Sequence, residues 1–246
     1  MAPGRRCTGV ILAGGQSARF GGEPKGLALI AGMRMIDRAA AALAEASDDL
    51  LVVANAAGAK AWLPGVRTVC DVRPGLGALG GVQTALHHTT SDVVVLAWDA
   101  PFVPGALLRA LRDAGERAGT EGASSEGASS EGAGSEGAGS EGVGSEGVGI
   151  AGEGIKGVDA VVPVSTGPWG FEPLVAWYSR ACLGVIEHRL DAGDARAGAW
   201  LDDVRVHRLD AARWGVSELL FYNVNTPGDL ARAELLANGV NLRKNG

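Results

Sequence analysis

The chain of 246 residues is 46% hydrophobic, enough to bury the core of one sizeable α/β domain. No apolar run reaches the ~18 residues of a membrane span, and the first residues lack the apolar stretch of a signal peptide, so we expect a cytoplasmic protein with no membrane partner. The net charge of −6 argues against a nucleic-acid partner. Cys7, Cys70 and Cys182 are expected to be reduced core thiols, because their wide spacing fits neither a zinc site nor a disulfide framework.

A glycine-rich loop follows the first predicted strand. The apolar run over 8–12 predicts that strand, and it passes directly into Ala13-Gly14-Gly15. Glycine pairs after strands are common as simple turns, but here Arg19 and Lys25 add two cations, and Pro24 fixes the backbone before the lysine. Since glycines also let several N–H groups face one anion, we interpret the loop as a phosphate-binding site. It has neither the Walker pattern nor the G-x-G-x-x-G spacing.

Strands and helices alternate through the first 118 residues. Apolar periodicity predicts a helix over 35–46, strands over 50–54 and 66–70, a second glycine-rich loop over 74–81, a helix over 82–88, a strand over 93–98 and a helix over 104–117. This alternation predicts right-handed βαβ units and a mostly parallel sheet.

Polar residues or glycines stand where four predicted strands end: Gly14, Asn55, Asp71 and Asp99. Ligands of parallel sheets bind outside the carboxyl ends of the strands, so we expect all four at one site. For Asn55 and Asp71, ordinary turn formation is an equally simple explanation. A carboxylate at the end of a buried strand is costly without a cation, and we therefore interpret Asp99 as a Mg²⁺ ligand.

A five-residue repeat of the form S-E-G-A/V-x occupies residues 120–149. It has no face to bury and is rich in glycine, so we expect a disordered insertion over about 119–157 within a single domain spanning 1–246. The alternative of a calcium-binding repeat lacks the required aspartates and nonapeptide period. Without the six glutamates of the repeat, acidic and basic residues are equal at 22 each.

The chain after the repeat returns to predicted secondary structure. We expect strands over 159–164 and 172–177, a helix over 179–190, a short helix over 193–201 and a strand over 204–209. Thr226 is predicted as a helix N-cap, with Pro227 at the first helical position and Asp229 in the first turn. Asn223 and Asn225 are two residues apart in an extended segment, so their side chains can point to the same side, although Asn225 can also simply precede the cap.

With these residues assembled, the chain resembles the molybdenum cofactor guanylyltransferases of the nucleotidyltransferase superfamily, from about residue 8 to about 236 outside the repeat. Leu12-Ala13-Gly14-Gly15 with Ser17, Arg19 and Lys25 is similar to the signature loop of that family, and Asp99 with Pro101 is similar to its magnesium-binding Asp-x-Pro. The remaining matches are Gly77 to Gly81, Glu172-Pro173-Leu174 through Gly193, and Asn223 to Pro227.

The resemblance implies a three-layer Rossmann-like nucleotidyltransferase fold and transfer of GMP from GTP to the terminal phosphate of the molybdopterin cofactor, with Mg²⁺ as cofactor. Arg19, Lys25 and Asp99 are then the catalytic residues, and Asn223 and Asn225 bind the acceptor or complete the metal shell. The implied nucleotide-binding residues are Leu12, Ala13, Gly14, Gly15, Ser17, Lys25, Asn55, Asp71, Gly77 and Asp99. Transient contact with molybdoenzymes or other cofactor-assembly proteins is also implied.

Two departures from the family pattern leave alternatives open. Pro24 precedes the loop lysine, as in the sugar-nucleotide and cytidylyl branches, and Ala78 replaces an expected proline. A cytidylyl- or sugar-phosphate nucleotidyltransferase is therefore the alternative enzyme. A non-catalytic nucleotide-binding protein is the alternative from another class, which the intact Arg19, Lys25 and Asp99 argue against.

Overall fold

The computed structural model describes residues 6–14, 24–125 and 157–244. Seven strands form one sheet in the order β5-β4-β1-β6-β8-β7-β9, and a separate hairpin contains β2 (Leu29–Ile30) and β3 (Met33–Arg34). The sheet strands are β1 (Cys7–Leu12), β4 (Asp49–Val53), β5 (Arg67–Val69), β6 (Asp92–Ala97), β7 (Ala160–Pro163), β8 (Val175–Tyr178) and β9 (Val206–Leu209). Only β8 pairs antiparallel with its neighbours, which confirms the predicted mostly parallel sheet.

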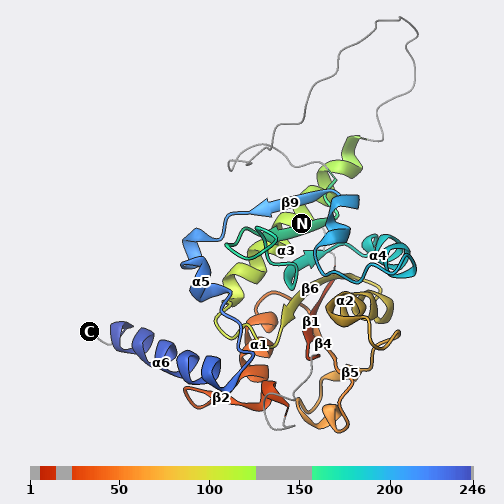
Figure 1. Ribbon diagram of the computed structural model, residues 1–246. Helices are drawn as coiled ribbons and strands as arrows, with labels where there is room; N and C mark the ends of the chain where they lie inside the picture. The colour runs from red at the N-terminus through yellow and green to blue at the C-terminus, as the bar shows by residue number, and fades with distance from the viewer. Residues whose placement is uncertain (1–5, 15–23, 126–156, 245–246) are drawn as a thin grey trace, which may run out of the picture.

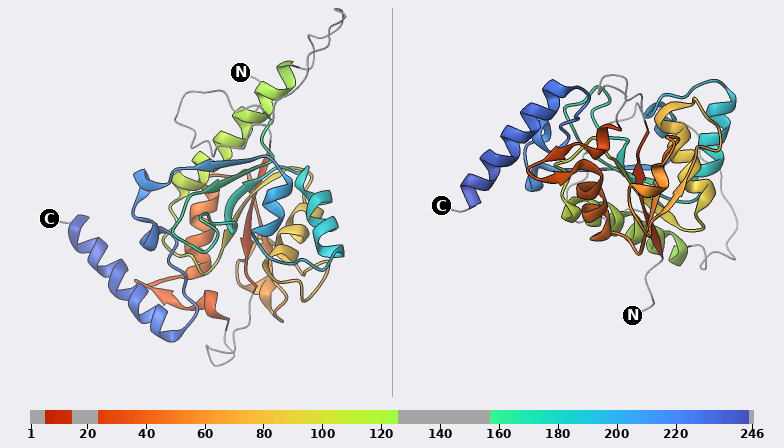
Figure 2. Two further views of the ribbon diagram at one scale, coloured as in Figure 1. Left: turned by 45° about the horizontal axis from the view of Figure 1, so that its top comes forward. Right: turned by 90° about the horizontal axis from the view of Figure 1, so that it is seen from below.

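Helices cover both faces of the sheet, which confirms the three-layer architecture (Figures 1 and 2). Alternate strand residues separate the two cores: Ile11 packs with α1 (Met35–Ala44) and α3 (Gly105–Ser125), whereas Val10 packs with α2 (Gly77–His88) and α4 (Cys182–Asp191). All six β1 residues are buried, as expected for a strand covered on both faces.

The C-terminal helix α6 (Pro227–Lys244) packs against the β2–β3 hairpin, away from the main sheet (Figure 1). Ile30, Met35, Val224, Ala233 and Ala237 form a small third core between them. The short helix α5 (Ser217–Leu220) precedes the segment that leads into α6. None of the described helices is long and apolar enough to cross a membrane.

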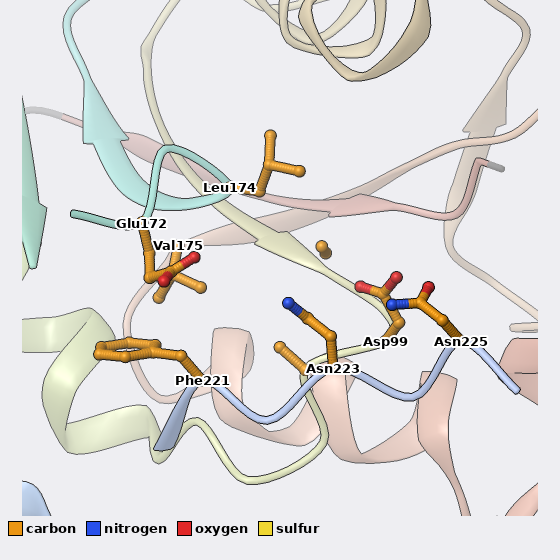
Figure 3. A pocket seen from close by; sticks show the side chains of 9 residues that line it. Asp99, Glu172, Leu174, Val175, Phe221, Asn223 and Asn225 are labelled. Atoms are coloured by element: carbon orange, nitrogen blue, oxygen red, sulfur yellow. The ribbon is translucent and has the colours of Figure 1, made fainter. Parts of the chain in front are cut away.

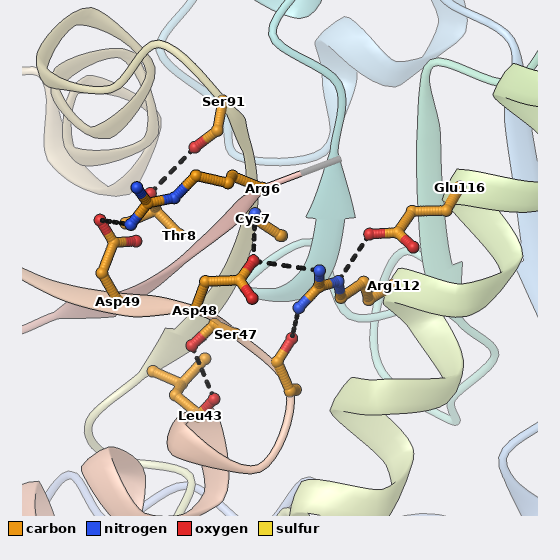
Figure 4. A network of polar contacts seen from close by, with 11 residues as sticks. Arg6, Cys7, Thr8, Leu43, Ser47, Asp48, Asp49, Ser91, Arg112 and Glu116 are labelled. Atoms are coloured by element: carbon orange, nitrogen blue, oxygen red, sulfur yellow. Dashed lines mark hydrogen bonds and ion pairs between the residues drawn. The ribbon is translucent and has the colours of Figure 1, made fainter. Parts of the chain in front are cut away.

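A network of polar contacts holds the amino edge of the sheet (Figure 4). The Asp48 carboxylate accepts hydrogen bonds from the backbone N–H of Cys7 at 2.8 Å and from Arg112 at 3.0 Å. Arg112 on α3 also donates to Glu116 at 2.6 Å. This network ties α3 to the start of β1, at the edge opposite to the one where Asp99 follows β6.

Several predicted boundaries were wrong. Residues 77–81 begin α2 and are not loop. The glycine at position 81 packs closely against β1, because a Cβ there would lie 3.2 Å from the Leu12 side chain. α3 continues to Ser125 and so includes the first residues of the repeat, whereas residues 126–156 lie outside the described residues. The short helix expected over 193–201 is a 3₁₀ helix at Ala199–Asp203, after Gly193 ends α4 with φ of +82°.

The expectation that all three cysteines lie in the core was also wrong. Cys7 and Cys182 are buried, but Cys70 is exposed because it follows β5, the last strand at one side of the sheet. Burial raises the pKa of the Cys7 and Cys182 thiols to about 12 each, which keeps both thiols protonated at neutral pH.

Candidate active site

The carboxyl edge of the sheet collects the predicted strand-end residues. β5, β4, β1 and β6 run parallel, so Asp71, Asn55, Gly14 and Asp99 all follow strands that end at this edge. Gly14 is exposed, and a Cβ added there would have no described atom within 4 Å. Gly15, Ser17 and Arg19, three members of the predicted phosphate-binding loop, lie outside the described residues.

The start of the loop is fixed by the sheet. The Leu12 and Ala13 side chains are buried, the Leu12 carbonyl accepts from the Trp98 N–H at 3.2 Å, and the Ala13 N–H donates to the Val53 carbonyl at 2.9 Å. The Ala13 amide is therefore already used by the neighbouring strand, and the assignment of Ala13 to the nucleotide-binding residues stays a prediction. Among the described loop residues, Gly14 is the first whose amide has no such bond to the sheet.

Asn55 and Asp71 form a pair across the ends of β4 and β5. The Asn55 side-chain N–H donates to Asp71 Oδ2 at 2.6 Å, and the Asp71 backbone N–H donates to Asn55 Oδ1 at 2.8 Å. The pair is partly open to solvent. Asn55 thereby orients Asp71, and the second carboxylate oxygen, Oδ1, has no hydrogen bond to a described residue.

Lys25, Asp99 and Asn225 form the centre of the candidate site. The Lys25 ammonium lies 2.6 Å from Asp99 Oδ2 and donates to Asn225 Oδ1 at 2.9 Å. The lysine is only 8% exposed. An ammonium group has three N–H donors, and these two contacts leave one for a further acceptor.

Local structure around Lys25 explains its position. Pro24, with φ of −62°, precedes a 3₁₀ helix at Lys25–Leu27. Within this helix, Gly26 follows the lysine and lies directly against the Trp98 ring. A Cβ at position 26 would be 2.0 Å from that ring. The absence of a side chain at Gly26 therefore lets the lysine backbone approach the end of β6, where Asp99 follows Trp98.

Asn225 is held by the start of α6. The Thr226 hydroxyl accepts from the Asp229 N–H at 3.1 Å, and the Asp229 carboxylate accepts from the backbone N–H groups of Asn225 and Thr226 at 3.0 and 2.9 Å. This reciprocal capping box confirms the predicted N-cap. The Val224 N–H also donates to the Asp99 carbonyl at 2.9 Å, so this segment is tied to the end of β6.

A pocket extends from this triad toward β8 (Figure 3). Asp99 and Asn225 lie at one side of the pocket, Glu172 and Phe221 lie at the other, and the Asn223 amide lies between them. Leu174 and Val175 add apolar walls. Burial raises the pKa of Glu172, and a hydrogen bond with the Ser165 side chain opposes that shift.

Four pocket residues were not predicted from the sequence: Glu172, Leu174, Val175 and Phe221. Residues 172–174 precede β8, which begins at Val175 and not at 172 as predicted. Because β8 is antiparallel to β6, its first residues reach the same edge as the last residues of β6. The direction of a strand depends on its pairing with strands far away in the sequence, and the local sequence around residue 172 does not indicate that direction.

The polar groups around Asp99 suit a hard cation that also binds water or phosphate oxygens. In the described part of the chain, no group of three or more His, Cys, Asp or Glu side chains could hold a metal. Asp99 offers one carboxylate, and the side-chain amides of Asn223 and Asn225 line the same pocket as neutral polar groups. Mg²⁺ is commonly held in this way, through one or two carboxylates together with water and substrate phosphates.

Gly77 opens α2 with φ of +61°, a conformation that L side chains rarely adopt. It is exposed at the helix N-terminus. A helix N-terminus directs unpaired N–H groups outward and favours anions. Its proposed contact with the nucleotide stays a prediction.

Comparisons with known proteins identify the family and the fold. A family model described as the MobA-like NTP transferase domain matches residues 9–209. A molybdenum cofactor guanylyltransferase of Desulfosudis oleivorans is 29% identical over 92% of this chain and 94% of its own length. Molybdopterin-guanine dinucleotide biosynthesis protein A from Archaeoglobus fulgidus has a similar structure, with a TM-score of 0.67 and 22% identity over 94% of this chain and 99% of its own.

The same fold occurs in an enzyme of the cytidylyl branch. The 2-C-methyl-D-erythritol 4-phosphate cytidylyltransferase from Thermus thermophilus has a TM-score of 0.58 at 17% identity, covering 93% of this chain and 98% of its own. These structural likenesses establish the fold, and the fold alone does not select the base.

Proposed function

Because the chain belongs to the MobA-like NTP transferase domain family, we propose that it transfers GMP from GTP to the terminal phosphate of molybdopterin and releases pyrophosphate. The observation that carries this proposal is the Lys25–Asp99–Asn225 triad at the carboxyl edge of the sheet. The guanylyltransferase name of the Desulfosudis oleivorans relative supports the choice of GTP and of a molybdopterin acceptor.

In the proposed reaction, an acceptor phosphate oxygen attacks the α-phosphorus of GTP, and the bond from that phosphorus to the β-phosphate bridging oxygen breaks. The protein contributes positioning and charge neutralisation. Lys25 has one N–H donor left for an α-phosphoryl oxygen, and its low exposure strengthens that interaction. The loop amides from Gly14 onward, with Arg19, hold the β- and γ-phosphates.

Mg²⁺ belongs to the proposal, with Asp99 as its protein carboxylate. When bound, the ion would neutralise charge on the donor and acceptor phosphates. Lys25 occupies Oδ2 of Asp99, so Oδ1 is the oxygen left for a ligand. Asn223 and Asn225 stand beside Asp99 and orient the acceptor phosphate.

Base selection is assigned to Asp71 and Asn55. Guanine presents neighbouring amino and imino N–H donors, which an acceptor such as Asp71 Oδ1 suits, and Asn55 fixes the orientation of that carboxylate. Pro24 is the feature that favours the cytidylyl alternative. A cytoplasmic location and transient contact with molybdoenzymes stay predictions from the sequence.

Pyrophosphate release, measured with GTP, CTP and ATP in turn and with molybdopterin as acceptor, tests the proposal. We expect GTP to be preferred, and the Asp71→Ala variant to lose more of that preference than of its rate with CTP or ATP, since a site built on hydrogen bonds rejects bases that leave its groups unpaired. A clear preference for CTP would move the protein to the cytidylyl branch. Absence of release with all three would support the non-catalytic alternative.

A further inference from the structure

Glu172 is the one charged side chain at the β8 side of the pocket. It is about half-buried, and no ion pair to a cation is recorded for it within the described residues. A carboxylate in such a position loses hydration, and the hydrogen bond with the Ser165 side chain leaves further acceptor positions that a fixed donor can fill. The structure therefore offers an acceptor group that the proposed catalytic step does not use.

The walls around Glu172 suit a flat ring. Phe221, Leu174 and Val175 are apolar and line the same part of the pocket, while the polar residues Asp99, Asn223 and Asn225 line the other part (Figure 3). Small-molecule sites commonly combine apolar walls with a few polar groups that fix orientation. A ligand with a heteroaromatic ring at one end and a phosphate at the other matches this division.

The sheet order separates Glu172 from the residues assigned to the nucleotide base. Asn55 and Asp71 follow β4 and β5, on one side of β1, whereas Glu172 precedes β8, on the far side of β6. Asp99 follows β6 and lies between the two groups. A base held by Asp71 and a ring held by Glu172 would therefore lie on opposite sides of the metal-binding carboxylate.

From this arrangement we infer that Glu172 recognises the pterin ring of the acceptor, with its carboxylate accepting two hydrogen bonds from the ring N–H and the neighbouring exocyclic amino group; this inference rests on the proposed function. A 2-amino-4-oxo ring edge presents these two donors side by side, and a carboxylate accepts both. The Asn223 amide, which lies between Glu172 and Asp99, can donate to the ring carbonyl or to the phosphate.

Guanine carries the same donor edge, so the test must separate a pterin from a second guanine. The probe is 6-hydroxymethylpterin, whose fluorescence reports binding to the full-length protein without any turnover. The variant is Glu172→Gln, which keeps the side-chain shape but replaces one acceptor oxygen with a donor. Glu187→Gln on α4 is the matched control, because Glu187 lies outside the pocket and its side chain has no hydrogen bond to a described residue.

We expect Glu172→Gln to weaken pterin binding at least about tenfold, since a hydrogen bond to a charged acceptor is lost and a donor now faces a donor. Glu187→Gln should bind like the wild type. In the transfer reaction, the KM for molybdopterin should rise in Glu172→Gln while the KM for GTP stays unchanged. Circular dichroism melting verifies folding, and we expect no loss of Tm because the substitution removes a partly buried charge.

Two results would overturn the inference. One is pterin affinity within twofold of the wild type in Glu172→Gln. The other is displacement of the pterin by GMP with equal loss of GMP affinity in the variant, which would assign the pocket to guanine. Failure of the proposed function is a different result, namely that the wild type binds the pterin but transfers no GMP to molybdopterin.

Discussion

At the scale of single residues, the pairing of Lys25 with Asp99 changes what the aspartate requires. A carboxylate at the end of a buried strand needs a cation, and the Lys25 ammonium at 2.6 Å supplies one. The Asp99 charge is therefore already compensated by Lys25, and the reason to expect Mg²⁺ is the negative charge of the substrate phosphates. Breaking a partly buried pair from either side leaves the other group uncompensated.

The Asp99→Asn variant separates these two roles. Asparagine retains an oxygen that can accept from Lys25, so we expect the free energy of unfolding to fall by only about 1–3 kcal/mol. Turnover should fall by about 10²-fold or more, because the charge that holds Mg²⁺ is gone. The measurement is pyrophosphate release as a function of Mg²⁺ concentration, together with thermal denaturation.

Asp113→Asn is the matched control for this experiment, since Asp113 is exposed on α3 and has no hydrogen-bond or ion-pair partner among the described residues. It should match the wild type in both assays. Near wild-type turnover of Asp99→Asn with an unchanged Mg²⁺ requirement would contradict the assignment of Asp99 as a metal ligand.

The sequence predicted which residues stand at the strand ends but not how they pair. Asp99 and Asn225 were assigned to the site, yet their direct contacts with Lys25 join positions 74 and 200 residues apart, which no local pattern reports. Ala13 belongs to the predicted phosphate-binding loop, but the sequence did not predict that its amide donates to the Val53 carbonyl at the end of β4. Glu172 was missed because its location depends on the reversed direction of β8.

At the scale of elements, Gly26 determines how closely the Lys25 segment can approach β6. A Cβ at this position would meet the buried Trp98 ring, which stacks on Trp62 with a centroid distance of 5.2 Å. We expect Gly26→Ala to lower the free energy of unfolding by about 1–3 kcal/mol through overpacking. Turnover should also fall, since Lys25 and Asp99 are the neighbours of the two clashing residues.

Gly184→Ala is the control for that substitution. Gly184 lies inside α4, is exposed, and a Cβ there would have no described atom within 4 Å. Replacing a helical glycine with alanine is expected to raise stability by about 0.5–1 kcal/mol without affecting turnover. Thermal denaturation of both variants, with turnover measured well below Tm, tests these two expectations. Equal stability of the two variants would show that position 26 is not tightly packed.

Asp159 and Arg205 fix the start of the β7–β9 pair. The Arg205 side chain and backbone donate to the Asp159 carboxylate at distances of 2.9–3.1 Å, and these side-chain hydrogen bonds hold the pKa of Asp159 below its ordinary value. The carboxyl therefore binds protons more weakly in the folded than in the unfolded chain. Its contribution to stability is complete above the unfolded pKa of about 3.8 and is lost as the pH falls through the folded pKa.

We expect Asp159→Asn to be less stable than the wild type at neutral pH by about 0.5–1 kcal/mol, a small value because the Arg205 side chain is 67% exposed. The difference should shrink as the pH falls below about 4. Urea denaturation of both proteins between pH 7 and pH 3 measures it. A difference that is independent of pH over this range would mean that the carboxylate charge does not stabilise the strand pair.

At the scale of the whole molecule, the two edges of the sheet have different tasks. The carboxyl edge carries Asp99, Lys25 and the pocket, whereas the amino edge carries the Asp48–Arg112 network (Figures 3 and 4). α3 starts near the first edge and ends near the second, where β7 begins. The sequence predicted this alternation of strands and helices because each βαβ unit is encoded locally. The order of strands beyond β6, including the reversal at β8, depends on long-range packing.

After the repeat, the described chain resumes beside α3 at the amino edge. The Gly157 N–H donates to the Ala118 carbonyl at 3.1 Å, so the segment that enters β7 is tied to α3 at a point before that helix ends at Ser125. That point is at the end of the sheet opposite to Asp99. An insertion between these two hydrogen-bonded residues can change length with little effect on the rest of the fold, because the cost of closing a loop grows slowly with its length.

Deletion of residues 121–149 should therefore leave turnover unchanged and raise the free energy of unfolding by about 1 kcal/mol or less. The few residues that stay on each side are long enough to join Ala118 to Gly157. A variant with the same segment in permuted order is the control for composition, and it should behave like the wild type. Turnover and thermal denaturation of both variants provide the measurements. Loss of folding or activity on deletion would make the repeat a structural part of the domain, because the hydrogen bond between Ala118 and Gly157 would then not suffice to close the α3–β7 connection.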